Sequence, residues 1–588
     1  MTDPQPADDR RAPDQLPRTD GGTATGADET TLDPWGSSTV ADYRKLFEEF
    51  GIEEFDDVLS AVPSPHYLMR RGVIFGHRGY DRVARAMAND EEFAVLSGWM
   101  PTGDPHIGHK LVIDEIVWHQ QQGGDAYALI ADMEAHSARG LSWDEIARHS
   151  REYLLSLIAL GFDPEEGEIY RQSDNRPLQD LAFELGAHVN FSEMQALYGF
   201  DGETNVSHMQ SVVTQMADIL YPQIDEPKPT VIPVGPDQDP HVRLSRDLAA
   251  SMRYFKVSEA YASFETGSQE EQLLLEWVYE NLAESAHSQE LDAEIIRCDL
   301  AAELLSEYRE VHPNFEGEAP HGANAELSEE GADGLFVKEA FHDETGNIQL
   351  PNPSIENVFD DVFAVEGFPY ERISTETYDE LIGKLQNSGK EPLRPRRRLF
   401  NREGTEEAFE ALIEAVEGEK RVYEGHIDSF ELSREDAESL AREVELDHGG
   451  YGFVAPSSIY HRFMTGLTGG KMSSSVPASH ISLLDDPEEG YEKVKSATTG
   501  GRETAEKQRE LGGRADECPV YELYNYLLAA DDDEFAIRVY EECTNGERLC
   551  GGCKEQAAEL MREFLADHQE KREEAKELLD DLDIDLDP

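Results

Sequence analysis

Short apolar segments alternate with stretches of helical periodicity between about residue 90 and residue 260. The apolar segments are "FAVLSGW", "AYALIADM", "EIYRQS" and "PTVIPVG", and the helical stretches include the run that begins at Ile107 and "EIARHSREYLLSLIALGF". Strands that alternate with helices form a parallel sheet with helices packed against its faces. The sequence therefore predicts an α/β, doubly wound domain whose ligands bind at the turns after the C-terminal ends of the strands.

The chain carries far more acid than base: 123 Asp and Glu residues against 51 Lys and Arg residues give a net charge of −72. The acidity runs along the whole sequence, including predicted helices such as "SREDAESLAREVELDHGG". This distribution fits a halophilic protein, because the Debye length is only about 3 Å at 1 M salt. The charge thus indicates a habitat, and local basic spots would have to contact any nucleic acid. The run "LRPRRRLF" is one such spot, although a solvated surface run is the more common explanation.

The length of 588 residues predicts several domains. No segment reaches the roughly 18 uncharged apolar residues of a membrane span, and the N-terminus lacks a secretion signal, which predicts a cytoplasmic protein without membrane contact. Composition and periodicity divide the chain into six predicted regions. These are a disordered acidic tail (1–38), an N-terminal helical extension (39–90), the first part of the α/β domain (91–263), an acidic insertion of unknown fold (264–448), the rest of the α/β domain (449–500) and a helical domain (501–588).

The stretch "PTGDPHIGHK" places His106 and His109 where a predicted strand meets a predicted helix. The N–H groups at a helix N-terminus have no partner within the helix and carry partial positive charge, so this end favours an anion. Imidazole N–H groups beside them suit a phosphate whose charge grows during a reaction. A metal pair lacks a supporting carboxylate or third histidine. Taken alone, a capped helix with incidental histidines explains the stretch equally well.

A second stretch, "GLTGGKMSSSVP", sets Lys471 between glycines and three serines. Such a loop can close over a triphosphate, because the ammonium neutralises the leaving pyrophosphate while hydroxyl and backbone N–H groups complete the cradle. On its own, a flexible linker with an incidental lysine is the commoner explanation of this composition. The two stretches together decide between these interpretations.

Together they resemble the HIGH and KMSKS motifs of the class I aminoacyl-tRNA synthetases. The first motif matches letter for letter, and the second differs only in Ser474, which replaces its second lysine. That replacement occurs in the tryptophanyl and tyrosyl branch of the class. The resemblance implies a Rossmann-like catalytic domain, a helical anticodon-binding domain at 501–588, and a two-step reaction with ATP, Mg²⁺ brought by ATP, an amino acid and tRNA.

The resemblance also implies the roles of single residues. His106 and His109 would donate to the phosphates, Gly108 would leave room for adenine, and Lys471 would stabilise the departing pyrophosphate. It adds these residues to the phosphate and nucleotide site: Thr102, Met472, Ser473, Ser474 and Ser475.

A third segment, "VIPVGPDQDPHVRLSRDLA", contains Gly235, Asp237 and Gln238 after a predicted strand. It resembles the turn near the ribose in this class, where a carboxylate accepts from both ribose hydroxyls and a glycine permits close approach. An ordinary strand-to-helix turn capped by Asp is the alternative.

The amino-acid pocket has to distinguish indole from phenol, and a buried acceptor for the indole N–H would do so. The resemblance places Gln215 near the head of the amino acid and either Asp218 or Glu134 near its ring; the alternative role of each is to hydrogen-bond other pocket residues. The segments "DQDPHVRLSRD", "YHRF" and "TGGRETAEKQRELGG" resemble archaeal tryptophanyl enzymes. The expected substrates are therefore L-tryptophan, ATP and tRNA(Trp), in a homodimer. A tyrosine-tRNA ligase and a noncatalytic RNA-binding paralogue are the alternatives.

Four cysteines lie close together near the C-terminus: Cys518, Cys543, Cys550 and Cys553. A cytoplasmic chain argues against disulfides, and the "CGGC" turn suits adjacent positions on a metal. A similarly spaced set binds an iron–sulfur cluster in some tryptophanyl synthetases, so an iron–sulfur cluster or zinc is one expectation. Reduced core cysteines are the alternative.

Overall fold

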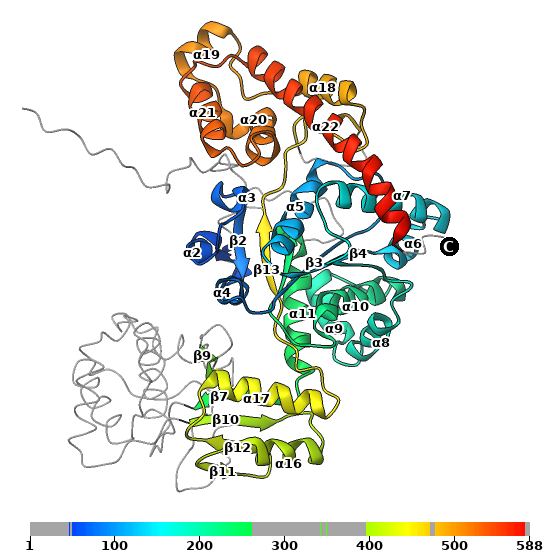
Figure 1. Cartoon of the computed structure of the whole chain (residues 1–588), viewed down its shortest axis with the longest axis vertical. Coiled ribbons are helices and arrows are strands. Elements are labelled where there is room, and N and C mark those ends of the chain that lie inside the picture. The colour runs from blue at the N-terminus through cyan, green and yellow to red at the C-terminus, as the bar shows by residue number, and fades with distance from the viewer. Residues whose placement is uncertain are drawn as a thin grey trace, which may run out of the picture. The chain divides into compact units, whose positions relative to one another are not determined.

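The computed structural model describes residues 46–47, 50–260, 341–342, 348–349, 396–470 and 477–582. The chain divides into two compact units, which Figure 1 shows. One unit joins Met1–Met252 to Phe453–Pro588, and the other comprises Arg253–Gly452. Among the helices in these ranges, none has the length and apolar content to cross a membrane.

A seven-stranded sheet forms the centre of the first unit. In spatial order its strands are β1 (Glu53–Glu54), β2 (Ile74–Arg78), β13 (Ser457–His461), β6 (Thr230–Val234), β3 (Ala94–Trp99), β4 (Asp125–Ile130) and β5 (Glu168–Arg171). The five strands from β13 to β5 are parallel, and β2 and β1 continue the sheet in antiparallel pairing. The predicted α/β fold is therefore confirmed, and β3, β4, β5 and β6 are the four predicted strands.

The region before residue 90 differs from its prediction as a helical extension. It contains the helices α2 (Phe55–Leu59), α3 (Tyr67–Arg70) and α4 (Asp81–Asn89), but also β1 and β2. Four of the five β2 residues are buried, so this strand lacks the alternation of apolar and polar residues that identifies a half-buried strand. A Cβ on Gly76 would lie 2.6 Å from the Ile52 side chain, which shows how closely β1 and β2 approach.

Seven α-helices lie between β3 and residue 252, where the first unit's N-terminal segment ends: α5 (Ile107–Gln121), α6 (Asp132–Arg139), α7 (Trp143–Ala159), α8 (Arg176–Leu185), α9 (Phe191–Tyr198), α10 (Val206–Leu220) and α11 (Asp239–Ser251). The sequence specifies their starts locally. Ser142 begins α7 with a capping box, in which its hydroxyl accepts from the Glu145 N–H while the Glu145 carboxylate accepts from the Ser142 N–H. Asn190 and Glu193 repeat this arrangement at α9.

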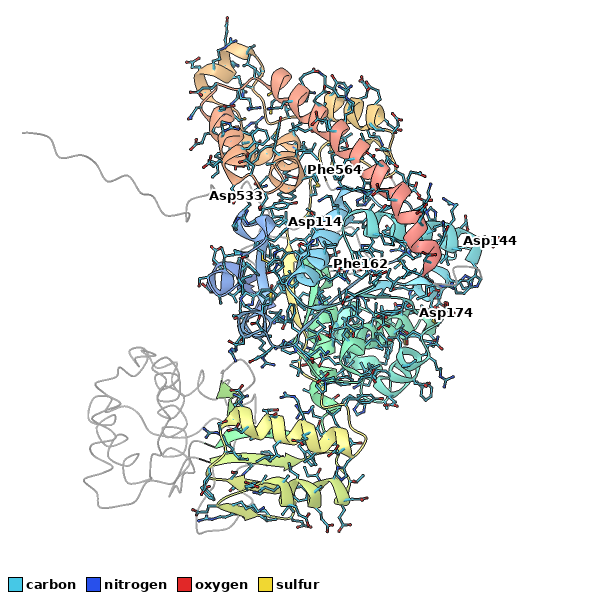
Figure 2. All side chains as sticks on the ribbon, in the orientation of Figure 1. Asp114, Asp144, Phe162, Asp174, Asp533 and Phe564 are labelled. Atoms are coloured by element: carbon cyan, nitrogen blue, oxygen red, sulfur yellow. The ribbon has the colours of Figure 1, made fainter. Side chains whose placement is uncertain are left out.

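The C-terminal part of the same unit is helical, as predicted. After a short turn (Pro477–Ser479) come α18 (Pro487–Ser496), α19 (Ala505–Leu511), α20 (Pro519–Leu523), a π-helical turn (Tyr524–Leu528), α21 (Asp533–Thr544) and α22 (Cys550–Asp581). The long helix α22 packs against α18 and α7. It also reaches α5: Lys110 Nζ lies 2.5 Å from Asp114 Oδ2 and 5.7 Å from the ring centroid of Phe564. Figure 2 labels Asp114 on α5 and Phe564 on α22.

The second unit contains a four-stranded antiparallel sheet in the order β11 (Lys420–Val422), β12 (His426–Ser429), β10 (Arg396–Asn401) and β7 (Phe255–Ala260). The helices α16 (Glu406–Ala415) and α17 (Arg434–Asp447) cover its apolar face, while β8 (Phe341–His342) and β9 (Ile348–Gln349) form a separate pair. The unit is wider than the predicted insertion at 264–448, because β7 pairs with β10 and not with the central sheet. In the basic run, the Arg398 guanidinium donates to both carboxylate oxygens of Asp428 at 2.5 and 2.8 Å.

Candidate active site

A cavity of about 970 Å³ opens at the C-terminal ends of β3, β4 and β6. The start of α5 contributes His106, Gly108 and His109 to its wall, and the turn after β6 contributes Gly235, Asp237 and Gln238. The helices α6 and α10 contribute Glu134, Gln215 and Asp218. Nine predicted site residues thus share one cavity. Thr102 is exposed and is not part of the described wall, and residues 471–476, with Lys471, Met472 and the three serines, lie outside the described residues.

The two histidines at the start of α5 bind backbone N–H groups through the same ring atom. His106 Nδ1 accepts from the Gly108 N–H at 3.1 Å, and His109 Nδ1 accepts from the His106 N–H at 3.1 Å. The rings stack with their centroids 3.8 Å apart. Since Nδ1 is an acceptor in both, each neutral ring carries its proton on Nε2.

Burial keeps both rings neutral. It lowers the pKa of His109 to about 4 and that of His106 well below its ordinary value, with a further contribution from neighbouring histidines. At neutral pH each ring therefore offers one N–H donor, on Nε2, and has no tendency to take up a proton. This state suits hydrogen bonding to a phosphate and does not suit proton transfer.

The segment after residue 476 joins the histidine turn directly. His106 forms an isolated antiparallel bridge with Ser482, and the Ile107 N–H donates to the Ile481 carbonyl at 3.1 Å. Before residue 471, the Gly466 N–H donates to the Gly470 carbonyl at 2.7 Å, and the Leu467 N–H donates to the Ser479 carbonyl at 2.9 Å. The two ends of the serine-rich stretch are thus fixed beside the cavity.

At residue 235, in the turn after β6, a side chain would displace its neighbours. A Cβ there would lie 2.6 Å from Asp237 Oδ1 and 2.9 Å from a ring carbon of Phe463, closer than real Cβ atoms approach. In the same turn, Gln238 accepts a hydrogen bond through Oε1 from Gln215 Nε2 at 3.3 Å. This contact links the turn after β6 to α10 across the cavity wall.

At the α10 end of the cavity, Asp218 is buried and accepts two hydrogen bonds. The Tyr170 hydroxyl donates to Oδ1 at 3.2 Å, and Gln172 Nε2 donates to Oδ2 at 2.7 Å. Burial raises the pKa of Asp218 well above its ordinary value, and these two hydrogen bonds oppose that rise. Glu134 is also buried and lines the same end.

Several wall residues escape a search of the sequence for motifs. Gln172 follows directly after β5, His461 ends β13 at a register shift, and Arg139 ends α6 at the exposed side. The sequence places Gln172 near the end of the predicted strand "EIYRQS", and this position is the available signal for it. His461 belongs to the "YHRF" segment, whose strand the apolar pattern does not reveal.

The four C-terminal cysteines line one small cavity of about 20 Å³. Burial raises the pKa of Cys543 to about 12 and that of Cys553 to about 11, so these thiols stay protonated. All four thiols are free. No group of three or more His, Cys, Asp or Glu side chains in the described ranges is arranged to hold a metal ion.

A sheet of this topology, with a histidine pair at the first helix and a glycine turn after β6, defines an α/β enzyme that binds its ligand at the C-terminal strand ends. Comparisons with known proteins agree. The family of class I tRNA synthetases for W and Y matches residues 88–272 and 428–566. The chain belongs to this family.

Individual relatives match almost the whole chain. Tryptophan–tRNA ligase 1 of Halobacterium salinarum is 60% identical over 96% of this chain and 97% of its own length. The tryptophan–tRNA ligase of Methanosarcina acetivorans is 42% identical over 95% of this chain and 99% of its own. The crystal structure of tryptophanyl-tRNA synthetase from Aeropyrum pernix K1 matches 93% of this chain and 97% of its own at 28% identity, with a TM-score of 0.54.

Proposed function

We propose that this protein is a tryptophan-tRNA ligase. It activates L-tryptophan with ATP to give tryptophanyl-adenylate and pyrophosphate, and then transfers the tryptophanyl group to tRNA(Trp). The similarity to tryptophan–tRNA ligases over nearly the full length supports this substrate. The observation that carries the activation step is the pair of neutral imidazoles whose Nδ1 atoms are occupied by backbone N–H groups.

The activation step needs positioning and charge stabilisation more than acid–base chemistry, because a carboxylate is already a nucleophile and pyrophosphate already a leaving group. The Nε2–H groups of His106 and His109 donate to the phosphates as charge develops on them. The N-terminal end of α5 adds the positive end of the helix dipole at the same place. Mg²⁺ arrives with ATP and neutralises charge on the phosphates.

The remaining nucleotide contacts come from the turn after β6 and from the serine-rich stretch. Gly235 lets the ribose approach the backbone, and Asp237 accepts from its hydroxyls. Lys471 binds the departing pyrophosphate, and the serine hydroxyls at 473–475 complete the cradle. The anchored ends of that stretch beside His106 support this assignment.

Tryptophan-dependent exchange of pyrophosphate into ATP tests the proposal. We expect exchange with tryptophan, none with tyrosine, and aminoacylation of tRNA(Trp) in concentrated salt. Stimulation by tyrosine alone would make the protein a tyrosine-tRNA ligase, and exchange with neither amino acid would make it a noncatalytic paralogue. Lys471→Ala should lower the turnover of activation more than the affinity for tryptophan.

We further propose that the protein acts in the cytoplasm as a homodimer and that residues 501–588 contact the anticodon of tRNA. Phe183 on α8 and Val206 on α10 are 88% and 75% exposed, and α8 and α10 pack together, so this surface is a candidate for the dimer contact. Light scattering on Phe183→Asp should show monomers if this surface is the dimer contact. Unchanged dimers would place the contact elsewhere.

Metal binding by the four cysteines also stays a proposal. The single cavity that all four line supports it, and the absence of a metal-holding group among the described residues opposes it. Iron and zinc assays on anaerobically purified protein decide the matter. About one zinc or about four iron atoms per chain would support a site, and less than one equivalent of either metal would leave reduced core cysteines.

A further inference from the structure

The four-stranded sheet of the second unit has two faces of different character. One face carries the apolar residues that pack with α16 and α17 in a hydrophobic core: Phe255, Val257, Leu399 and Ile427. Side chains alternate along a strand, so the residues between these point to the opposite face. We call this opposite face the basic face. The side chains that the structure describes there, within the four strands, are Lys256, Arg398, Phe400, Arg421, His426 and Asp428.

The basic face reverses the charge balance of the chain. The whole chain has 123 acidic and 51 basic residues. On this face Lys256, Arg398 and Arg421 stand against Asp428, which is the one carboxylate among its described strand side chains. Arg398 belongs to the basic run "LRPRRRLF", and both Lys256 and Arg421 are exposed. In a protein of net charge −72, a polyanion binds where cations gather locally.

Aromatic rings form a stack beside these cations. Phe400 and His426 pair directly across the two central strands, and their ring centroids lie 5.5 Å apart. Tyr423, in the turn after β11, stacks on His426 with centroids 4.3 Å apart and an angle of 15° between the rings. Tyr423 is 42% exposed, so the stack ends in a ring that a ligand can reach. A nucleotide base can extend such a stack while an adjacent cation contacts its phosphate.

Arg398 holds the stack in position. Its guanidinium donates to both carboxylate oxygens of Asp428 at 2.5 and 2.8 Å, and its side chain is 15% exposed. Its Cζ lies 5.8 Å from the ring centroid of Phe400 and 5.9 Å from that of Tyr423. Arg398 is therefore a positioning residue, and the exposed Tyr423 and Arg421 are the residues that a ligand meets.

The topology of the sheet supports the same kind of ligand. The elements β10, α16, β11, β12 and α17 follow one another along the chain, and β7 pairs with the free edge of β10. This is a β-α-β-β-α-β arrangement whose last strand comes first in the chain. Four-stranded RNA-recognition modules stack unpaired bases on the aromatic side chains of their sheet. Topology alone is an analogy, and the charges and rings of the basic face carry the inference.

Concentrated salt makes the rings more important than the cations. The Debye length is about 3 Å at 1 M salt, so contacts between exposed cations and phosphates are strongly screened. Stacking of bases on aromatic rings does not depend on charge in this way. A ring stack bordered by a few cations therefore suits the binding of a nucleic acid by a halophilic protein.

We propose that the basic face binds unpaired nucleotides of RNA, with a base stacked on Tyr423 and a phosphate against Arg421. The RNA is the substrate tRNA, and this part rests on the proposed tryptophan-tRNA ligase activity. The face consists of residues of the second unit alone. It therefore adds a site to those proposed in the first unit.

Binding of a labelled oligonucleotide to the full chain tests the basic face. The probe is an unstructured single-stranded oligoribonucleotide of about twelve nucleotides, and fluorescence anisotropy in concentrated KCl gives its Kd. Tyr423→Ala removes the stacking ring and should raise Kd about tenfold. Arg421→Ala should raise it about threefold, because salt screens the phosphate contact. Absence of binding, equal binding of the matching RNA duplex, or an unchanged Kd in Tyr423→Ala would overturn the proposal.

Val422→Ala and Arg85→Ala are the matched controls. Val422 lies between the two tested residues and is 49% exposed, but its pairing with Ile427 places it on the opposite face. Arg85 on α4 is an exposed arginine of the first unit, with 67% of its side chain accessible. Both variants should keep Kd within about twofold of the wild-type value. A loss in Val422→Ala as large as that in Tyr423→Ala would overturn the contact, because a general loosening of β11 would then explain both.

Aminoacylation tests tRNA as the bound RNA. In Tyr423→Ala, KM for tRNA(Trp) should rise about tenfold, while tryptophan-dependent pyrophosphate exchange keeps the wild-type rate because it needs no tRNA. An unchanged KM would overturn tRNA as the occupant. A wild-type protein that does not exchange pyrophosphate with tryptophan would refute the proposed function and, with it, tRNA as the occupant. The oligonucleotide measurement decides the basic face itself in either case.

Discussion

The Glu115 carboxyl group lies 3.9 Å from His461 Nδ1 inside the first unit, with Oε1 as the nearer oxygen. Neither the carboxyl oxygens nor this nitrogen has a hydrogen-bond partner among the described residues. Burial raises the pKa of Glu115 well above its ordinary value and lowers the pKa of His461 to about 4, so burial favours the neutral form of each group. Two buried polar groups therefore face each other without a hydrogen bond.

Glu115→Met should stabilise the protein. Methionine has a similar volume and leaves no buried carboxyl group unpaired, so we expect the free energy of unfolding to rise by about 1–3 kcal/mol. Denaturant unfolding at constant salt measures it. The neighbouring Asp114→Asn should have the opposite effect, because Asp114 accepts from both Lys110 Nζ and the Tyr67 hydroxyl. A loss of stability in Glu115→Met would show that the carboxyl group has a favourable role.

Two variants of His106 should separate the role of Nε2–H as a donor to the substrate from the role of Nδ1 as the cap of α5. Asparagine can still accept from the Gly108 N–H but has no atom at the place of Nε2, so turnover of pyrophosphate exchange should fall about a hundredfold without loss of stability. Glutamine keeps an N–H near Nε2 and loses the cap, so it should cost about 1 kcal/mol of stability and less turnover. Equal turnover in the two variants would remove the donor role of Nε2.

Gly235→Ala should weaken ATP binding through sterics alone. The added Cβ would lie 2.6 Å from Asp237 Oδ1 and 2.9 Å from a ring carbon of Phe463, so these side chains must shift and the proposed ribose contact of Asp237 is disturbed. We expect KM for ATP to rise about tenfold and stability to fall by about 1–3 kcal/mol. Gly202→Ala is the control, because a Cβ there meets no atom within 4 Å. An unchanged KM in the first variant would place the nucleotide away from this turn.

The four strands named by the sequence share a clear signal, a short apolar run before a helix. The strands β2 and β13 lack it. Their pairing partners lie far away in the sequence, since Ser458 pairs with Arg78 and Ser457 with Val231. β13 is buried along its whole length and contains two serines and a histidine, so neither alternation nor hydrophobicity marks it. These two strands are therefore defined by pairing with distant segments and not by a local hydrophobic pattern.

The site residues also fall into those with a local sequence signal and those that depend on distant contacts. The motif residues His106, Gly108 and His109 are predictable because their chemistry depends on a local strand-to-helix turn. Gln172 is recognisable as a wall residue only in the structure, where its amide donates to Asp218, 46 positions away in the sequence. Thr102 lies on the same turn as the histidines but is exposed, because nearness in sequence does not set the direction of a side chain.

Buried histidines should make the protein acid-labile. Burial lowers the pKa to about 4 in His66, His109, His119 and His461, and to about 3 in His241 and His568. In the unfolded chain a histidine takes up its proton near pH 6.5, so between about pH 6.5 and pH 4 the unfolded state binds more protons. The stability from these residues is therefore complete above pH 6.5 and is lost as the pH falls toward 4.

Each such histidine adds up to about 1.4 kcal/mol per pH unit to the slope of the free energy of unfolding. Denaturant unfolding between about pH 4.5 and pH 7.5 at constant salt measures that slope. His119→Gln removes one buried ring and should reduce the slope by about that amount, whatever it does to stability at pH 7. His188→Gln alters an exposed histidine and should leave the slope unchanged. Equal slopes in both variants would mean that His119 does not lose its proton on folding, and that acid lability arises from other groups.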